Sequence, residues 1–320
     1  RSTAMMGGKH MRRSFVHLQL VSVALLWGGA FVAIKDLVGT VSPVTVTTLR
    51  FLLTGATYGL LLAIWPPARA RIDRRDRGRL LVLAVTGTAG YHLALNTGER
   101  FVSAGVASLI VASMPVMVAL LSARILRERI GAVKRAGIGL ALAGVVLLTL
   151  YGTPGTRLEL RNLGGALIAV LAPVCWAIHT VIAKPMASRY GAIPVTAQAV
   201  TIGSVLLLPF GAPATLADLP RLTGGDWAWL AFLAFGCTVY AYLIWNAALR
   251  RMEASTVAAY VYLVPVSSLA WAAIVLGERL TAFAAFGGAL VLAGVILTER
   301  GTGWLEARRQ PHEEAVKDAA

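Results

Sequence analysis

The chain has 320 residues, of which 57% are hydrophobic and 14% charged, and its mean hydropathy is +0.71. A soluble domain needs more charge to cover its surface, so this composition excludes one. The formal net charge of +15 would suit a nucleic-acid partner. However, the basic residues are confined to short segments between apolar runs, which is typical of a topology signal in a membrane protein. We therefore expect a lipid bilayer around the chain and no nucleic acid.

Apolar runs follow one another along the whole chain. We interpret residues 1–10 as an expression scar and Met11 as the natural start, and we exclude the scar from functional reasoning. Each run is long enough to cross a hydrocarbon core, which takes about 20 residues per helix. The predicted transmembrane helices are 15–35, 43–65, 79–98, 104–126, 132–151, 163–184, 193–211, 227–249, 254–276 and 281–299. A polar tail, 300–320, follows them.

The distribution of Lys and Arg predicts the orientation. If the N-terminus is cytoplasmic, the inside segments hold 23 of the 30 basic residues and the outside loops hold 6. Cytoplasmic loops carry the excess of positive charge in membrane proteins. Both termini, including the 300–320 tail, are therefore predicted to face the cytoplasm.

The two halves of the chain are related in sequence. A shift of 150 aligns residues 87–148 on 237–298 without a gap, with 20 of 62 pairs identical. We therefore predict an all-α membrane protein made of two five-helix repeats, 11–151 and 152–299. Because five is odd, the second repeat enters the membrane from the opposite side, so the repeats are inverted. Inverted repeats are typical of alternating-access transporters; gene duplication in a protein that does not transport is the alternative.

Several motifs resemble a known superfamily. They are Leu26-Trp27-Gly28-Gly29 with Lys35 in the first helix, Leu49-Arg50-Phe51 in the second, and the stretches Pro115 to Arg129 and Pro265 to Arg279. On these motifs the chain resembles the drug/metabolite transporter superfamily, specifically its EamA-type ten-helix branch. It is similar to bacterial aromatic amino-acid exporters. Arg127 stands where the family has Gly, which puts that turn in doubt. The resemblance implies a multi-pass protein of the bacterial inner membrane.

Polar side chains inside spans are candidates for function. Two stripes recur at four-residue spacing, which places each on one helix face. They are Thr88, His92 and Asn96 in the third helix and Thr238, Tyr242 and Asn246 in the eighth. Because these positions match between inverted helices, we expect them to face one central cavity. The alternative is hydrogen bonding between helices, which Asn and Thr often provide in membranes.

Aromatic rings and histidines complete the candidate substrate-binding set. They are Trp27, Tyr91, Trp176, His179, Trp245 and Tyr260. Such rings can stack on a flat apolar substrate or hold a cation over a ring face. Each ring is equally compatible with helix packing.

Three prolines within spans are predicted hinges: Pro115, Pro173 and Pro265. Each removes one backbone hydrogen bond of its helix. The carbonyls so released are those of Val111, Ala169 and Val261, and they are tolerated in a membrane where they line a cavity. They offer acceptors for a substrate ammonium group.

The acidic residues bear on the energy source. All fifteen Asp and Glu fall in loops, tails or span ends, whereas proton-coupled pumps usually place a carboxylate inside the membrane. We therefore predict facilitated transport through an uncharged pocket that suits a zwitterion.

The sequence predicts a secondary transporter that exports small metabolites, above all amino acids and preferably aromatic ones, by alternating access. The alternative is a multidrug or organic-cation exporter, coupled to protons through a histidine. Cys175 and Cys237 give no metal-ligand spacing, and no catalytic set or cofactor motif stands out, so neither an enzyme nor a cofactor is expected. The oligomeric state stays open and is compatible with a monomer.

Overall fold

The computed structural model describes residues 2–98, 110–151, 163–276 and 281–307. In the first half, the described elements are α1 (Ser2–Thr40), α2 (Pro43–Ile64), α3 (Arg77–Ala84), α4 (Tyr91–Gly98), α6 (Met114–Leu121) and α7 (Ala132–Tyr151). In the second half they are α8 (Leu163–Tyr190), α9 (Ala192–Asp218), α10 (Gly224–Ala231), α11 (Ala241–Leu249), α12 (Ala254–Ala259), α13 (Leu263–Leu276) and α14 (Ala282–Ala307). Within these ranges every regular element is helical.

Shorter helical turns join some of these elements into longer rods. A π-helical stretch, Val85–Gly90, joins α3 to α4, and another, Phe232–Tyr240, joins α10 to α11. The 3-10 turn Tyr260–Tyr262 joins α12 to α13. Eight of the described helices are long and apolar enough to cross a membrane. Ile110–Leu126 is a shorter apolar helix, and α7 is a separate helix of 20 residues. Within the described ranges, each of the ten predicted spans is matched by a helical segment, so the all-helical membrane fold is confirmed.

The two π-helical stretches occupy matching positions in the third span of each half. They contain Thr88 and Thr238, which are related by the 150-residue shift. π-Turns inside α-helices are rare and frequent at functional sites. No local sequence pattern predicted them.

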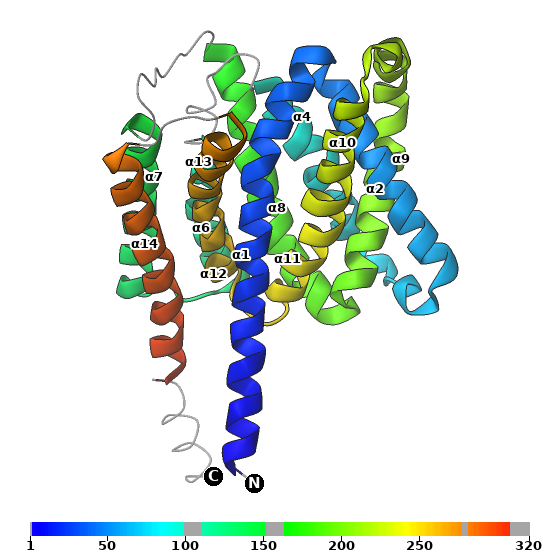
Figure 1. The fold of residues 1–320 in the computed structure, drawn as a ribbon. Coiled ribbons are helices and arrows are strands. Elements are labelled where there is room, and N and C mark those ends of the chain that lie inside the picture. The colour runs from blue at the N-terminus through cyan, green and yellow to red at the C-terminus, as the bar shows by residue number, and fades with distance from the viewer. Residues whose placement is uncertain (1, 99–109, 152–162, 277–280, 308–320) are drawn as a thin grey trace.

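Small residues bring helices into close contact at the edges of the bundle. Helices α7 and α14 lie side by side along one edge, and α2 and α9 lie on the other side (Figure 1). A Cβ built on Gly144 would lie 2.7 Å from the Gly287 carbonyl oxygen, and one on Gly294 would lie 2.4 Å from the Ala141 nitrogen. The small residues of these two spans therefore pack them against each other within one chain.

Helix α1 begins and α14 ends at the same end of the bundle (Figure 1). We call this the terminal end, and the opposite one the far end. The prediction that the terminal end faces the cytoplasm stays a prediction.

Candidate functional site

A cavity lies between the two halves. Its walls come from α1, α2, α4, α8, α11, α13, the Ile110–Leu126 segment and the turn before α13. Its lining includes Trp27, Phe31, Ile34, Arg50, Tyr91, His92, Leu95, Val111, Met114, Trp176, Tyr242, Val261 and Val264. The space between these atoms is about 510 Å³, which includes space open to the exterior and is therefore an upper limit for a ligand.

The cavity lies near mid-depth in the bundle and reaches toward the far end. Ile34 and Leu95 lie close to the ends of α1 and α4, while Val111 lies at the start of the Ile110–Leu126 segment. Ile34 and Leu95 are thus nearer the far end, whereas Tyr242 and Val261 lie in the parts of their helical rods nearer the terminal end.

Trp176 stands at the centre of an aromatic cluster and is 2% exposed. Its ring centroid lies 5.4 Å from that of Trp27, 5.1 Å from Tyr91 and 5.0 Å from Tyr242. Such edge and tilted contacts stabilise beyond the burial of area alone. The Trp27 indole donates to the Cys237 carbonyl at 2.9 Å. The Trp176 Nε1 is buried and has no hydrogen-bond partner among the described residues.

Both ring nitrogens of His92 are engaged. Its Nε2 lies 3.0 Å from the Tyr242 hydroxyl, which itself donates to the Gly87 carbonyl at 2.7 Å. Because the Tyr242 hydroxyl proton binds the Gly87 carbonyl, Nε2–H of His92 donates to the Tyr242 oxygen. The Nδ1 lies 3.4 Å from Nη1 of Arg50 and accepts from it. These partners assign the neutral imidazole with its proton on Nε2.

Arg50 is a site residue that the sequence analysis did not select. It is 3% exposed, lines the cavity and donates from Nε to Thr238 Oγ1 at 2.8 Å. The prediction of an uncharged pocket is therefore wrong, because it rested on the positions of the carboxylates alone. The signal was available in the sequence as a lone charge within the Leu49-Arg50-Phe51 motif of an apolar span.

The two polar stripes divide between cavity and helix contacts. The Asn96 amide donates to Thr47 Oγ1 at 3.0 Å, and the Asn246 amide donates to Thr196 Oγ1 at 2.7 Å. These are equivalent bonds in the two halves, and they join helices. His92 and Tyr242 instead line the cavity.

The remaining candidates lie around the cavity. Thr88, His179 and Asn246 border a second, smaller space, and His179 Nδ1 lies 3.3 Å from the Leu83 carbonyl. Trp245 packs 5.2 Å from Trp27, and Tyr260 lies nearer the terminal end, 2.5 Å from His17 Nδ1. The structure thus brings Trp27, Tyr91, His92, Trp176 and Tyr242 together at one cavity, with the other seven candidates as neighbours.

Two predicted hinges lie where a helix begins. Pro115 is the second residue of α6, and Pro265 is the third residue of α13, directly after the 3-10 turn. Pro173 lies inside a continuous α8. Val111 and Val261, four residues before Pro115 and Pro265, line the cavity. That the three prolines act as hinges stays a prediction.

The terminal end is held by ion pairs between the halves. Lys134 Nζ lies 2.6 Å from Glu253, and the lysine side chain is fully buried. A Cβ on Gly301 of α14 would lie 2.8 Å from the Lys134 nitrogen, which places this pair at the terminal end.

Glu128 makes a second link between the halves. Its carboxylate accepts from the Ala254 nitrogen at 2.7 Å and the Ser255 hydroxyl at 2.7 Å, so it caps α12, and it lies 3.5 Å from Lys184. Burial alone would raise the pKa of this carboxyl. The bonds from Ser255 and Ala254, together with Lys184, outweigh burial and hold the pKa below its ordinary value. The carboxylate therefore stays charged at neutral pH.

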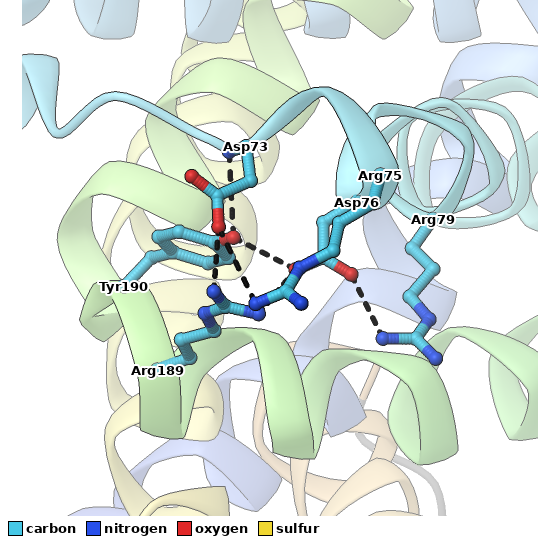
Figure 2. A network of polar contacts seen from close by, with 6 residues as sticks. All are labelled: Asp73, Arg75, Asp76, Arg79, Arg189 and Tyr190. Atoms are coloured by element: carbon cyan, nitrogen blue, oxygen red, sulfur yellow. Dashed lines mark hydrogen bonds and ion pairs between the residues drawn. The ribbon is translucent and has the colours of Figure 1, made fainter.

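A third link joins the turn before α3 to the end of α8 (Figure 2). Asp76 accepts from Tyr190 at 2.7 Å, Arg79 at 2.8 Å and Arg189 at 3.1 Å, while Arg189 also binds Asp73 at 2.5 Å. Together with the other two links, these contacts hold the two halves together at the terminal end. Among the described residues no group of three or more His, Cys, Asp or Glu is placed to hold a metal ion.

Known proteins match most of the length of this chain. An "Uncharacterized transporter" of Archaeoglobus fulgidus is 34% identical over 88% of this chain and 97% of its own. A "Probable terminal-alkyne amino-acid exporter" of Streptantibioticus cattleyicolor is 31% identical over 88% of this chain and 93% of its own. A solved structure titled "Crystal structure of protein" has the same fold, with a TM-score of 0.73 at 23% identity, over 93% of this chain and 99% of its own.

The repeat found in the sequence is also the unit of a protein family. Residues 14–150 and 163–300 each match the EamA-like transporter family. The two matches cover both halves and leave out only the terminal segments and the link between the halves. This multi-pass membrane protein belongs to the EamA-like transporter family.

Proposed function

We propose that the protein exports amino acids, preferably aromatic ones, across the bacterial inner membrane. The aromatic cluster around Trp176, which lines the cavity between the two halves, is the observation that carries this proposal. Indole and phenol faces suit a flat apolar side chain. A relative named for amino-acid export, at 31% identity, supports the same substrate class.

The transport mechanism we propose is alternating access. The cavity lies near mid-depth and reaches toward the far end, while ion pairs hold the two halves together at the terminal end. With cytoplasmic termini, this arrangement is the outward-facing one. Exchange of the two inverted repeats' conformations would open the terminal end, by separating contacts such as that of Lys134 with Glu253 at 2.6 Å, and would close the far end.

We propose that this transport is facilitated. No carboxylate lines the cavity among the described residues, and both nitrogens of His92 already have partners. A proton on His92 would also place a second positive charge beside Arg50. We therefore expect no titrating group to couple substrate flux to a proton gradient.

Flux through the purified protein in proteoliposomes tests the proposal. We expect labelled tryptophan and phenylalanine to exchange faster than threonine, and a pH gradient imposed across the vesicles to leave the rate unchanged. Empty vesicles give the background. Strict dependence of tryptophan flux on the pH gradient would overturn the facilitated mechanism, and absence of amino-acid flux would overturn the function.

The second candidate is export of organic cations. Aromatic faces at the cavity favour it, since they attract a cation. The guanidinium of Arg50 at the same cavity opposes it by repulsion. A quaternary-ammonium dye in the same vesicles decides between them, because rapid dye flux without tryptophan flux would support the second candidate.

Replacing Trp176 by alanine is expected to lower tryptophan flux about tenfold or more, because its ring contacts three other cavity rings. Trp227→Ala is the matched control, because Trp227 is 41% exposed and lies away from the cavity. Both variants are compared at equal amounts of folded protein, measured by size-exclusion chromatography. Equal flux in the two variants would remove Trp176 from the site.

A further inference from the structure

Arg50 is a positive charge enclosed within the helical bundle. It lies in α2 among apolar neighbours and is 3% exposed. A charge at membrane depth is costly and marks a functional site when it faces a cavity. Arg50 lines the cavity between the halves. Because burying its positive charge is unfavourable, we expect a negative charge to compensate it.

The protein's described residues do not supply that charge. Nε donates to Thr238 at 2.8 Å, Nη1 to His92 at 3.4 Å and Nη2 to the Cys237 carbonyl at 3.4 Å. All three acceptors are neutral, and two of the bonds are long. In the described part of the chain no carboxylate forms an ion pair with Arg50; the carboxylates of Glu128, Glu253 and Asp76 are paired at the terminal end.

The guanidinium is nevertheless fixed in place. The Thr238 hydroxyl donates to the Leu233 carbonyl at 2.8 Å, which directs its oxygen's lone pairs toward Arg50 Nε. A guanidinium has five N–H donors, and three are accounted for here. One N–H on Nη1 and one on Nη2 remain for a ligand, and a guanidinium can bind a carboxylate through two parallel hydrogen bonds.

A second unused donor belongs to a residue that lines the cavity. Trp176 Nε1 is buried without a hydrogen-bond partner among the described residues, and its ring lines the same cavity as Arg50. A buried polar group without a partner in a cavity points to a ligand that supplies one. A ligand carboxylate has enough acceptor sites to satisfy both donors.

We propose that Arg50 binds the carboxylate of the transported solute, so that the transporter selects carboxylates over amines of the same shape. This inference rests on the proposed function and names the charged group that the site recognises. The aromatic faces of Trp27, Tyr91 and Trp176 then hold the rest of the molecule. An amino acid bound in this way neutralises Arg50 for the duration of its passage.

Competition with tryptophan flux tests the inference in the unmodified protein. Three indole compounds differ in their charged groups: tryptophan has both, indole-3-propionate has only the carboxylate, and tryptamine has only the ammonium. We expect indole-3-propionate to inhibit at concentrations near those of unlabelled tryptophan, and tryptamine to need at least about tenfold more. Equal inhibition by tryptamine and indole-3-propionate would overturn the proposal while leaving amino-acid export intact.

Variants assign this selectivity to Arg50. In Arg50→Gln we expect tryptophan flux to fall and the preference for indole-3-propionate over tryptamine to vanish, whereas Arg50→Lys should retain part of it. Arg135→Gln removes an exposed arginine whose guanidinium binds the Ile130 carbonyl, and it should leave both quantities unchanged. Retained preference in folded Arg50→Gln would overturn the assignment. If that variant does not fold, the inhibitor series on the unmodified protein still decides the substrate class.

Discussion

Replacing Glu253 by alanine is expected to destabilise the protein by about 3 kcal/mol, because it leaves the ammonium of Lys134 buried without a partner. Lys134 is fully buried, and its Nζ lies 2.6 Å from the Glu253 carboxylate. Glu253 itself is 30% exposed, so water screens part of the pair, and we place the cost at the low end of that for broken buried pairs. The measurement is the midpoint of thermal unfolding in detergent.

A double variant separates the ion pair from other effects of the substitution. The backbone carbonyl of Glu253 accepts from Thr256 and Val257 at the start of α12, and alanine keeps both bonds. We therefore expect Lys134→Met combined with Glu253→Ala to recover most of the lost stability, since no buried charge then remains. An additive loss in the double variant would contradict the assignment to Lys134.

The same pair bears on the transport cycle. It links the first turn of α7 to the residue directly before α12, and so it joins the two halves at the terminal end. An interaction present in one conformation and absent in the other shifts the equilibrium by its differential free energy. Breaking the pair should therefore favour the conformation that opens the terminal end, and the folded Glu253→Ala fraction should show altered flux of tryptophan.

The helices of the fold were predictable from the sequence because the thickness of the bilayer sets the length of each apolar run. Length and hydropathy alone predicted the spans. The described helices extend beyond the predicted limits at several ends; α9, for example, continues to Asp218 where the prediction stopped at residue 211. The extra turns carry contacts such as the Asp218 bond to Thr45, which depends on a helix distant in sequence.

The site was predictable only in part, because facing a cavity is a tertiary property. The period of a helix showed that His92 and Asn96 share one face, yet His92 borders the cavity while Asn96 binds Thr47 of α2. Which of the two occurs depends on how closely the neighbouring helix approaches. Arg50 was missed for the same reason, since its motif marks a family and gives no direction for the side chain.

The ion pairs that close the terminal end were beyond prediction. Glu128 and Glu253 fall in short polar connections and Lys134 lies at the start of a predicted span, where the sequence shows only an excess of positive charge. Pairing across the two halves requires the helices to be packed first. The repeat predicted that the halves are related, but a given conformation breaks that symmetry by closing one end.

Replacing Gly294 by alanine is expected to cost about 3 kcal/mol or more of stability, because the added carbon has no room. Its Cβ would lie 2.4 Å from the Ala141 nitrogen and 2.7 Å from the Ala141 Cα. Both are backbone atoms, so no side-chain rotation can relieve the contact. Helices α7 and α14 would have to separate along their length, which loses the packing that holds this edge of the bundle.

Gly139→Ala on α7 is the matched control. A Cβ on Gly139 meets nothing within 4 Å, and alanine is the better helix former by up to about 1 kcal/mol. We therefore expect an unchanged or slightly higher unfolding midpoint for Gly139→Ala, and a lower midpoint for Gly294→Ala in the same detergent. Gly144, the partner of Gly294 by the 150-residue shift, meets the Gly287 oxygen and Val291 nitrogen at 2.7 Å. Gly144→Ala should lower the midpoint too, and wild-type stability in both variants would show that this edge does not hold the halves together.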